Sequence, residues 1–405
     1  MPRSFRILIT ALIFSASGLL FANPPAAPAT PALPRPVIHP VPPAIDAKSY
    51  ILIDADSGKV LAEKNANAHL PPASLTKLMT MYVISDALKR GVIHADDKAR
   101  ISERAWKTGG SRMFVKVNDE VPVQSLLKGI VVASGNDAAV AMAEYIAGTE
   151  SAFAGLMNTE AARLGMDNSH FSDSNGLPNP DHYSTARDLA TLTRAIIRDF
   201  PEDYRLYSEK WFTWNNIRQP NRNRLLWHFP EADGLKTGHT NAAGFCLVGS
   251  AKKGSTRLIS VIMGEPSDEA RTEDSIRLLT YGFRFFETRP LYQADTPLAD
   301  VRVWKGTQKT VPLGLANTLY TTLPVGQYQN VHATLTFNNL IKAPLKKGTP
   351  CGQLTLILNN EVIATAPLLA LEDNQKGGVW RQMADTFHFN FNRLFPRHGE
   401  TINRG

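Results

Sequence analysis

The stretch "PPASLTKLMT" (residues 71–80) decides how the rest of the chain is interpreted. It places Ser74 three residues ahead of Lys77, directly after a Pro-Pro break and at the start of an apolar run with helical spacing. Such a serine is either a nucleophile beside its amine or the N-cap of an ordinary helix. The same spacing recurs at Ser125–Lys128 inside a helical pattern and at Ser250–Lys253 at a strand end. The spacing alone therefore does not decide between the two interpretations, and further motifs in the sequence are needed.

Two further short motifs follow Ser74 in order. Ser134-Gly135-Asn136 interrupts a helical pattern, and Lys236-Thr237-Gly238 precedes the strongly β stretch "GFCLVGS". A second such tripeptide, Lys107-Thr108-Gly109, comes before Ser134 and has no strand immediately after it, so we prefer the later one. The three motifs in this order are typical of penicillin-interacting serine enzymes. They favour Ser74 as a nucleophile.

The residue types suit serine-based acyl transfer. Side chains at i and i+3 of a helix share a face, so the Lys77 amine can take the Ser74 proton if burial and nearby cations lower its pKa. Ser134 can pass a proton toward the leaving amine, and the Asn136 amide can hold a substrate amide. The backbone N–H groups of Ser74 and His239 can form an oxyanion hole.

The third motif suits the recognition of a carboxylate. Lys236 supplies a cation and Thr237 a hydroxyl, while Gly238, which lacks a Cβ, lets the substrate backbone approach closely. His170, Asp181 and His182 are scattered without metal-ligand spacing. We therefore expect neither a metal nor a cofactor.

The pattern of apolar residues predicts a sheet covered by helices. Residues 49–66 form a candidate hairpin, residues 123–200 are mostly helical, and strand patterns return at 210–215, 244–253 and 256–264, before a helix from Ser267 to about Thr288. Beyond residue 292, short alternating segments split by Gly, Pro and Asn predict a small all-β domain running to about residue 371.

Composition and the N-terminus indicate an exported globular protein. The 405 residues are 43% hydrophobic and 20% charged, which is ordinary globular composition, and a net charge of +7 is too small a surplus to indicate nucleic acid binding. Arg3 and Arg6 precede an apolar run, which predicts a signal peptide over residues 1–22, followed by a Pro/Ala-rich leader over 23–44. Cys246 and Cys351 could form a disulfide in an oxidising compartment, but they lie far apart in the sequence and we favour two buried free thiols.

Several stretches resemble one family: "IDAKSYILIDADSGKVLAEKNA", "PASLTKLMT", "SGNDAAVAMA", "IRQPNRNRLLW", "DGLKTGHTNAAGF" and "LLTYGFRFFET". They are similar to the serine-type D-alanyl-D-alanine carboxypeptidases, the low-molecular-mass penicillin-binding proteins. The resemblance covers roughly residues 40–372. It implies an α/β (α+β) penicillin-binding transpeptidase/β-lactamase-like domain over residues 45–290 and a small C-terminal all-β sandwich domain over residues 291–372.

The resemblance also implies an activity and a set of roles. The enzyme is expected to remove the terminal D-alanine from peptidoglycan pentapeptides through an acyl-enzyme, to regulate cross-linking in this way, and to bind β-lactams covalently. Ser74 is the implied nucleophile and Lys77 its base, with Ser134 and Asn136 completing the centre. The residues implied to bind the terminal carboxylate are Lys236, Thr237, Arg271 and Arg222.

The sequence departs from the family at two points. The loop after Trp106 is compact, which leaves substrate preference and the deacylation rate open. Ala139 stands where the best-known branch has a cysteine, so the thiol sensitivity of that branch is not expected here. A β-lactamase, a D,D-endopeptidase of the same superfamily and a non-catalytic peptidoglycan-binding protein are the alternatives. The glutamate setting E-x-x-L-N that a class A β-lactamase needs does not occur between Asn136 and Lys236.

The C-terminal segment suggests attachment to a membrane surface. Apolar residues of 377–395 share one helical face, which resembles the family's amphipathic anchor and would lie in the membrane surface without crossing it. Phe387, Phe389 and Phe391 also alternate as in a strand. We expect a helix over 377–395 within a tail of residues 373–405, detached from the β domain by Gly377-Gly378. The expected location is the periplasm, at the outer face of the inner membrane.

Overall fold

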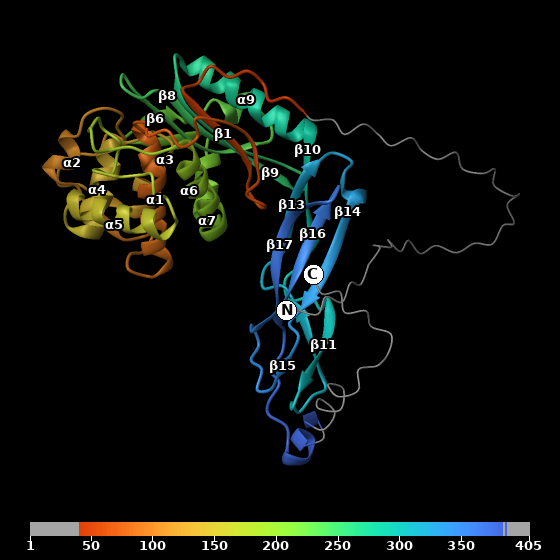
Figure 1. The fold of residues 1–405 in the computed structure, drawn as a ribbon. Coiled ribbons are helices and arrows are strands. Elements are labelled where there is room, and N and C mark those ends of the chain that lie inside the picture. Colours follow the sequence, from red (N-terminus) through yellow and green to blue (C-terminus); the bar gives the residue numbers. More distant parts are fainter. Residues whose placement is uncertain (1–39, 384, 387–405) are drawn as a thin grey trace, which may run out of the picture. The chain divides into compact units, whose positions relative to one another are not determined.

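The computed structural model describes residues 40–383, 385 and 386 of the chain (Figure 1). The predicted signal peptide and residues 23–39 of the leader lie outside the described residues. The chain divides into two compact units, one spanning Pro40–Thr288 and the other containing the described residues from Arg289 onward.

The first unit is built on a five-stranded antiparallel sheet with strand order β2-β1-β9-β8-β7 (Figure 1). Its strands are β1 (Ser49–Asp54), β2 (Val60–Lys64), β7 (Ala232–Thr240), β8 (Gly244–Lys253) and β9 (Thr256–Glu265). Two short hairpins accompany it, β3 (Lys98–Arg100) with β4 (Glu120–Pro122) and β5 (Trp211–Trp214) with β6 (Ile217–Pro220).

Helices are the main regular elements between β2 and β7. They are η1 (Ala73–Thr76), α1 (Lys77–Lys89), α2 (Glu103–Lys107), α3 (Val123–Val131), α4 (Asn136–Ala147), α5 (Glu150–Arg163), α6 (Ala186–Asp199), α7 (Pro201–Tyr204), η2 (Arg205–Ser208) and α8 (Leu225–His228). Helix α9 (Asp268–Phe285) follows the last strand of the sheet.

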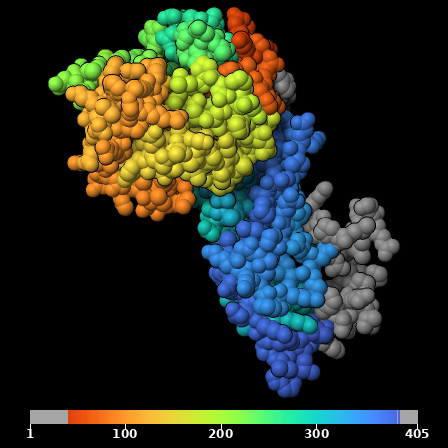
Figure 2. All heavy atoms as spheres, turned by 90° about the vertical axis from the view of Figure 1, so that its left-hand side faces the viewer, coloured from red at the N-terminus to blue at the C-terminus, as the bar shows by residue number. Residues whose placement is uncertain are grey.

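Both faces of the sheet are covered. Along β1, Ile51 and Ile53 belong to the core that contains the apolar residues of α1 and α3 to α6, whereas Tyr50 and Leu52 belong to the core beneath α9. Successive side chains of a strand point to opposite faces, so a strand covered on both faces is apolar throughout. In the space-filling view of Figure 2, the residues coloured orange to yellow gather on one side of the first unit. The predicted sheet covered by helices is confirmed.

The second unit is rich in strands, as predicted. One sheet has the order β14-β16-β17-β12-β11-β15. Its strands are β11 (Ala299–Trp304), β12 (Thr310–Gly314), β14 (Val331–Phe337), β15 (Ile341–Lys342), β16 (Pro350–Leu358) and β17 (Glu361–Ala370), and β13 (Leu319–Pro324) and η3 (Tyr328–Asn330) complete the unit. Strand β10 (Phe286–Tyr292) carries the chain across the boundary between the units. A core that includes Val303, Leu313 and Leu354 lies within the second unit.

Two local expectations differ from the structure. Ser74 lies in the 3-10 turn η1, and the α-helix proper begins only at Lys77. The helix predicted to reach Thr288 ends at Phe285, because the chain continues as strand β10 from Phe286. Both thiols, Cys246 and Cys351, are free and buried, as predicted.

The start of the C-terminal segment is bonded to the β-rich unit. Gly377 N donates to the carbonyl oxygen of Lys305, so the prediction that the two glycines detach this segment was wrong. Residues 379–383, 385 and 386 are helical, and residues 387–395 of the predicted helix lie outside the described residues. Within the part of the chain that the structure describes, no helix is long and apolar enough to span a bilayer.

Candidate active site

A tight turn brings Ser74 and Lys77 together. Side chains three residues apart eclipse one another in a 3-10 helix, and here Ser74 Oγ lies 2.9 Å from Lys77 Nζ. Ala73, just before the serine, has φ of 49°, a left-handed conformation that is strained for a residue with a Cβ. Such strain persists where the surroundings enforce it, which is common at functional sites.

Lys77 is buried and held at three points. Its side chain has 1% exposure. In addition to the contact with Ser74, its Nζ donates to Asn136 Oδ1 at 2.7 Å and to the carbonyl oxygen of Asn175 at 2.8 Å. Burial lowers the pKa of Lys77 to about 7, with a further lowering by the charge of Arg222 and opposing effects of Asp173 and Asp137. An amine with such a pKa is available as a base near neutral pH.

The break between α3 and α4 supplies the second motif. Ser134 is buried with φ of 57°, and its Oγ accepts a hydrogen bond from Lys236 Nζ at 2.8 Å. Asn136, the first residue of α4, donates from Nδ2 to the carbonyl oxygen of Gly109 at 2.6 Å. Its amide therefore links Lys77 to the loop after Trp106.

Strand β7 supplies the third motif and passes close to η1. A Cβ added to Gly238 would lie 2.9 Å from the carbonyl oxygen of Pro72 and 3.1 Å from Ser74 N, so a side chain there would push the two segments apart. Lys236 and Thr237 are buried beside it. Burial, and then the charges of Lys77, Arg222 and Arg271, lower the pKa of Lys236 well below its usual value.

The remaining predicted residues are His239, Arg271 and Arg222. His239 is exposed, and its ring centroid is 4.0 Å from that of Phe245. Arg271 is buried and donates from Nη1 to the carbonyl oxygens of Gly238 at 3.0 Å and Cys246 at 3.2 Å, while Nη2 pairs with Asp268. Arg222 is exposed, and its charge lowers the pKa of both Lys77 and Lys236. Among the described residues it has no hydrogen bond or ion pair to either lysine.

Sequence reasoning missed the segment 173–176, which lies behind Lys77. Besides the Asn175 carbonyl, it contains Gly176, whose added Cβ would fall 1.8 Å from the carbonyl oxygen of Ala73. His182, considered above only as a metal ligand, lies 2.9 Å from Thr76 Oγ1 and 3.5 Å from Asp173. "DSNG" predicts a turn and nothing more, because a backbone carbonyl carries no side-chain signal.

The competing motifs have contacts that are typical of structural residues. Lys128 pairs with Glu209 at 3.0 Å, and Ser250 Oγ accepts from Arg257 at 2.7 Å. Lys107-Thr108-Gly109 closes α2, although Gly109 borders the site through Asn136. Among the described residues, no group of three or more His, Cys, Asp or Glu is arranged to hold a metal ion.

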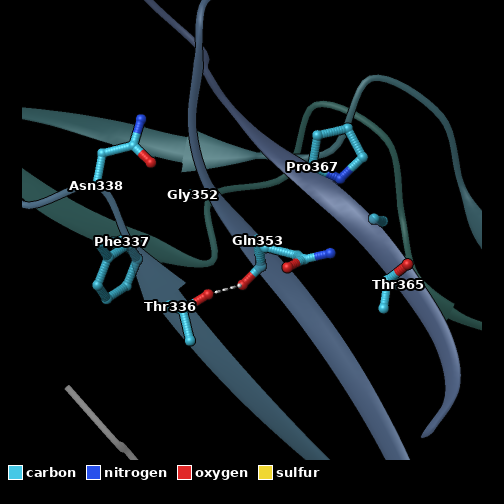
Figure 3. A pocket seen from close by; sticks show the side chains of 8 residues that line it. Thr336, Phe337, Asn338, Gly352, Gln353, Thr365 and Pro367 are labelled. Atoms are coloured by element: carbon cyan, nitrogen blue, oxygen red, sulfur yellow. Dashed lines mark hydrogen bonds between the residues drawn. The ribbon is translucent and has the colours of Figure 1, made fainter. Parts of the chain in front are cut away.

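The β-rich unit has an open hollow of its own (Figure 3). Its lining contains no ionisable side chain and consists of Thr336, Phe337, Asn338, Gly352, Gln353, Thr365, Ala366 and Pro367. The three motifs all lie in the first unit. The fold and the site together define a serine hydrolase of the penicillin-interacting class.

Comparisons with known proteins narrow the class. Residues 37–267 match the family model of D-alanyl-D-alanine carboxypeptidase, and residues 286–376 match that of the C-terminal domain of penicillin-binding protein 5. The chain is 45% identical to D-alanyl-D-alanine carboxypeptidase DacC of Escherichia coli, across 87% of this chain and 90% of that protein. It is 40% identical to DacF of Bacillus subtilis, across 83% and 87%.

Comparison with solved structures supports the same family. The crystal structure of penicillin-binding protein 5 from Haemophilus influenzae superposes with a TM-score of 0.80 at 42% identity, covering 83% of this chain and 99% of that one. The chain belongs to the D-alanyl-D-alanine carboxypeptidase family. It is a serine-type hydrolase with the activity of that family.

Proposed function

We propose that this enzyme removes the terminal D-alanine of peptidoglycan pentapeptides through an ester formed on Ser74. The observation that carries the proposal is the geometry of Lys77, whose buried Nζ lies 2.9 Å from Ser74 Oγ. An uncharged amine has two N–H groups and one lone pair. With the N–H groups directed at Asn136 Oδ1 and the Asn175 carbonyl, the lone pair is left to accept the Ser74 proton.

The other motif residues have roles in the same step. Ser74 Oγ attacks the carbonyl carbon of the penultimate D-alanine while Lys77 takes its proton, and the backbone N–H groups of Ser74 and His239 stabilise the oxyanion. As the C–N bond breaks, Ser134 donates its proton to the leaving D-alanine amine and recovers the one that Lys77 took from Ser74. Asn136 holds a substrate amide, and water then hydrolyses the ester.

The cationic side of the site suits the terminal carboxylate. Lys236 and Thr237 bind it directly, and Gly238, which lacks a Cβ, lets this strand lie against the turn that holds Ser74. The hydrogen bonds of Arg271 to the Gly238 and Cys246 carbonyls support a role in fixing β7, with its charge adding to the positive potential. Arg222, exposed at the same site, adds to that potential from its edge.

Purified protein should release free D-alanine from a pentapeptide that ends in D-Ala-D-Ala. The peptide is assayed beside a cross-linked muropeptide and a penicillin, because the alternatives are a D,D-endopeptidase and a weak β-lactamase. We expect release from the pentapeptide to be the fastest reaction. Cleavage of the cross-link at a higher rate would transfer the assignment to an endopeptidase, and no turnover of any substrate would leave a non-catalytic binding protein.

The location of the reaction is proposed to be the periplasm, where removal of the terminal D-alanine limits cross-linking. The predicted signal peptide supports export. Attachment to the outer face of the inner membrane is supported by the start of the C-terminal helix, where Val379, Trp380 and Met383 have exposures of 71%, 86% and 60%. The polar side of this helix is held by Asp385, which accepts from Lys305 N at 2.7 Å and pairs with Arg302.

Deleting residues 377–405 should abolish flotation of the protein with phospholipid vesicles. The full-length protein should float, and Trp380→Glu with Met383→Glu should weaken its partitioning at least about tenfold, since each large apolar side chain buried contributes about 1.5–3 kcal/mol. The matched control is Val362→Glu, which changes an apolar residue of 61% exposure elsewhere in the β-rich unit. Equal flotation of the full-length and truncated proteins would exclude this anchor.

A further inference from the structure

Glu150 is a buried carboxylate to which the mechanism above gives no role. It is the first residue of α5 and has 5% exposure. Its Oε1 accepts three hydrogen bonds, from Ser174 N at 3.1 Å, Ser174 Oγ at 2.7 Å and Asn175 Nδ2 at 3.1 Å. Its Oε2 pairs with Arg104 at 2.6 Å. A buried carboxylate with this many donors fixes whatever supplies them.

The segment that Glu150 fixes is the one that holds Lys77. The Asn175 carbonyl, adjacent to the groups bound by Glu150, accepts from Lys77 Nζ at 2.8 Å. The segment is also tied directly to α1, since Thr80 Oγ1 donates to the carbonyl oxygen of Ser174 at 2.6 Å. Thr80 lies one helical turn beyond Lys77. Helix α1 and the segment 173–176 are therefore joined at two points, one of which is the hydrogen bond from Lys77 to the Asn175 carbonyl.

The direction of the Ser74–Lys77 hydrogen bond depends on this acceptor. If the Asn175 carbonyl were displaced, an uncharged Lys77 would lose one of the two acceptors that hold its N–H groups. It could then rotate and donate to Ser74 Oγ, and in that orientation its lone pair would no longer face the proton to be removed. Displacements of about 1 Å in a catalytic constellation can cost about 100-fold in rate.

We propose that Glu150 is a positioning residue for acylation, which acts by fixing the Asn175 carbonyl that orients the Lys77 amine. This inference rests on the proposed role of Lys77 as the base. Arg104, whose side chain has 66% exposure, balances the charge of Glu150 from the solvent side. The positioning is done by Oε1, and the Arg104 ion pair is secondary.

The test compares variants by the kinetics of acylation with benzylpenicillin. Rate constants are measured over a range of concentrations, so that the acylation rate constant separates from the saturation constant for the non-covalent complex. Glu150→Ala should lower the rate constant about 10- to 100-fold and leave the saturation constant near the wild-type value. Glu150→Gln, which keeps an acceptor oxygen, and Arg104→Ala should both stay close to wild type.

Thr80→Val provides a second route if Glu150→Ala does not fold. It leaves Glu150 intact, removes the other tie to the segment, and should also lower the rate constant without changing the saturation constant. A wild-type rate constant in folded Glu150→Ala or in Thr80→Val would overturn the proposal. An equal loss in Arg104→Ala would assign the effect to the ion pair and overturn it too. Failure of the wild-type protein to react would instead contradict the proposed function.

Discussion

Replacing Ser74 with alanine should abolish both the covalent reaction with penicillin and the release of D-alanine. The side chain is the only group proposed to form the ester, and its Oγ is already within 2.9 Å of the base. We expect D-alanine release to fall by at least about 1,000-fold, since no second nucleophile replaces a missing one. The measurement is the turnover rate, with circular dichroism and the melting temperature confirming that the variant is folded.

The matched control is Ser125→Ala in α3. Ser125 precedes Lys128 with the same spacing that Ser74 has to Lys77, but Lys128 pairs with Glu209 at 3.0 Å. This variant should keep the wild-type rates of labelling and turnover. If Ser74→Ala retained labelling, or if Ser125→Ala lost it, the assignment of the nucleophile would be wrong.

Replacing Lys77 with methionine should lower the acylation rate about 100- to 10,000-fold, the range in which a general base contributes. Methionine approximates the length of the side chain and is apolar, which suits a position with 1% exposure. It leaves Asn136 Oδ1 and the Asn175 carbonyl without the Lys77 donor. Stopped-flow acylation by a chromogenic β-lactam measures the effect, with Lys128→Met as the control that should remain fast.

The pH dependence of the wild-type rate tests the same assignment. Burial lowers the pKa of Lys77 to about 7, so the amine is mostly charged below that pH and mostly a free base above it. The acylation rate should therefore rise as pH increases through about 7. In Lys77→Met this rise should disappear. Its persistence in the variant would assign the titration to another group and remove the support for Lys77 as the base.

Order and context in the sequence identify the candidate members of the site, because they exclude the competing motifs. The Pro-Pro break favours Ser74 over Ser125 and Ser250, and the strand that follows favours Lys236 over Lys107. The structure joins Ser74, Lys77 and Asn136 by hydrogen bonds and joins Ser134 to Lys236 by another. The close packing of Gly238 against Ser74 N brings the third motif beside the first. Side-chain chemistry at fixed spacing is visible in a sequence.

The parts that could not be predicted depend on backbone groups and close packing. The Asn175 carbonyl accepts from Lys77, yet any residue has a carbonyl, so nothing at position 175 indicated the contact. The same holds for Gly176 and Gly238, whose missing Cβ atoms matter only because Ala73 and Pro72 lie against them. Glu150 is likewise typical of a helix start, and only the fold shows that it reaches Ser174.

The C-terminal segment shows a different limit. Paired glycines usually indicate a flexible connection, but Gly377 N bonds to Lys305 and Asp385 bonds to the N–H of the same residue. The periodicity of apolar residues nonetheless predicted a side that is left exposed at Val379, Trp380 and Met383. A glycine pair permits a flexible connection, but the tertiary hydrogen bonds to Lys305 fix this one in place.

The most direct test of the central claim is the site of covalent modification. The intact protein is mixed briefly with benzylpenicillin, quenched in acid, weighed by mass spectrometry and then digested for peptide mapping. We predict a gain of one whole penicillin molecule per chain, located on Ser74 in the peptide that contains "PPASLTKLMT". An unmodified protein, or an adduct on any other residue, would contradict an acyl-enzyme mechanism at Ser74.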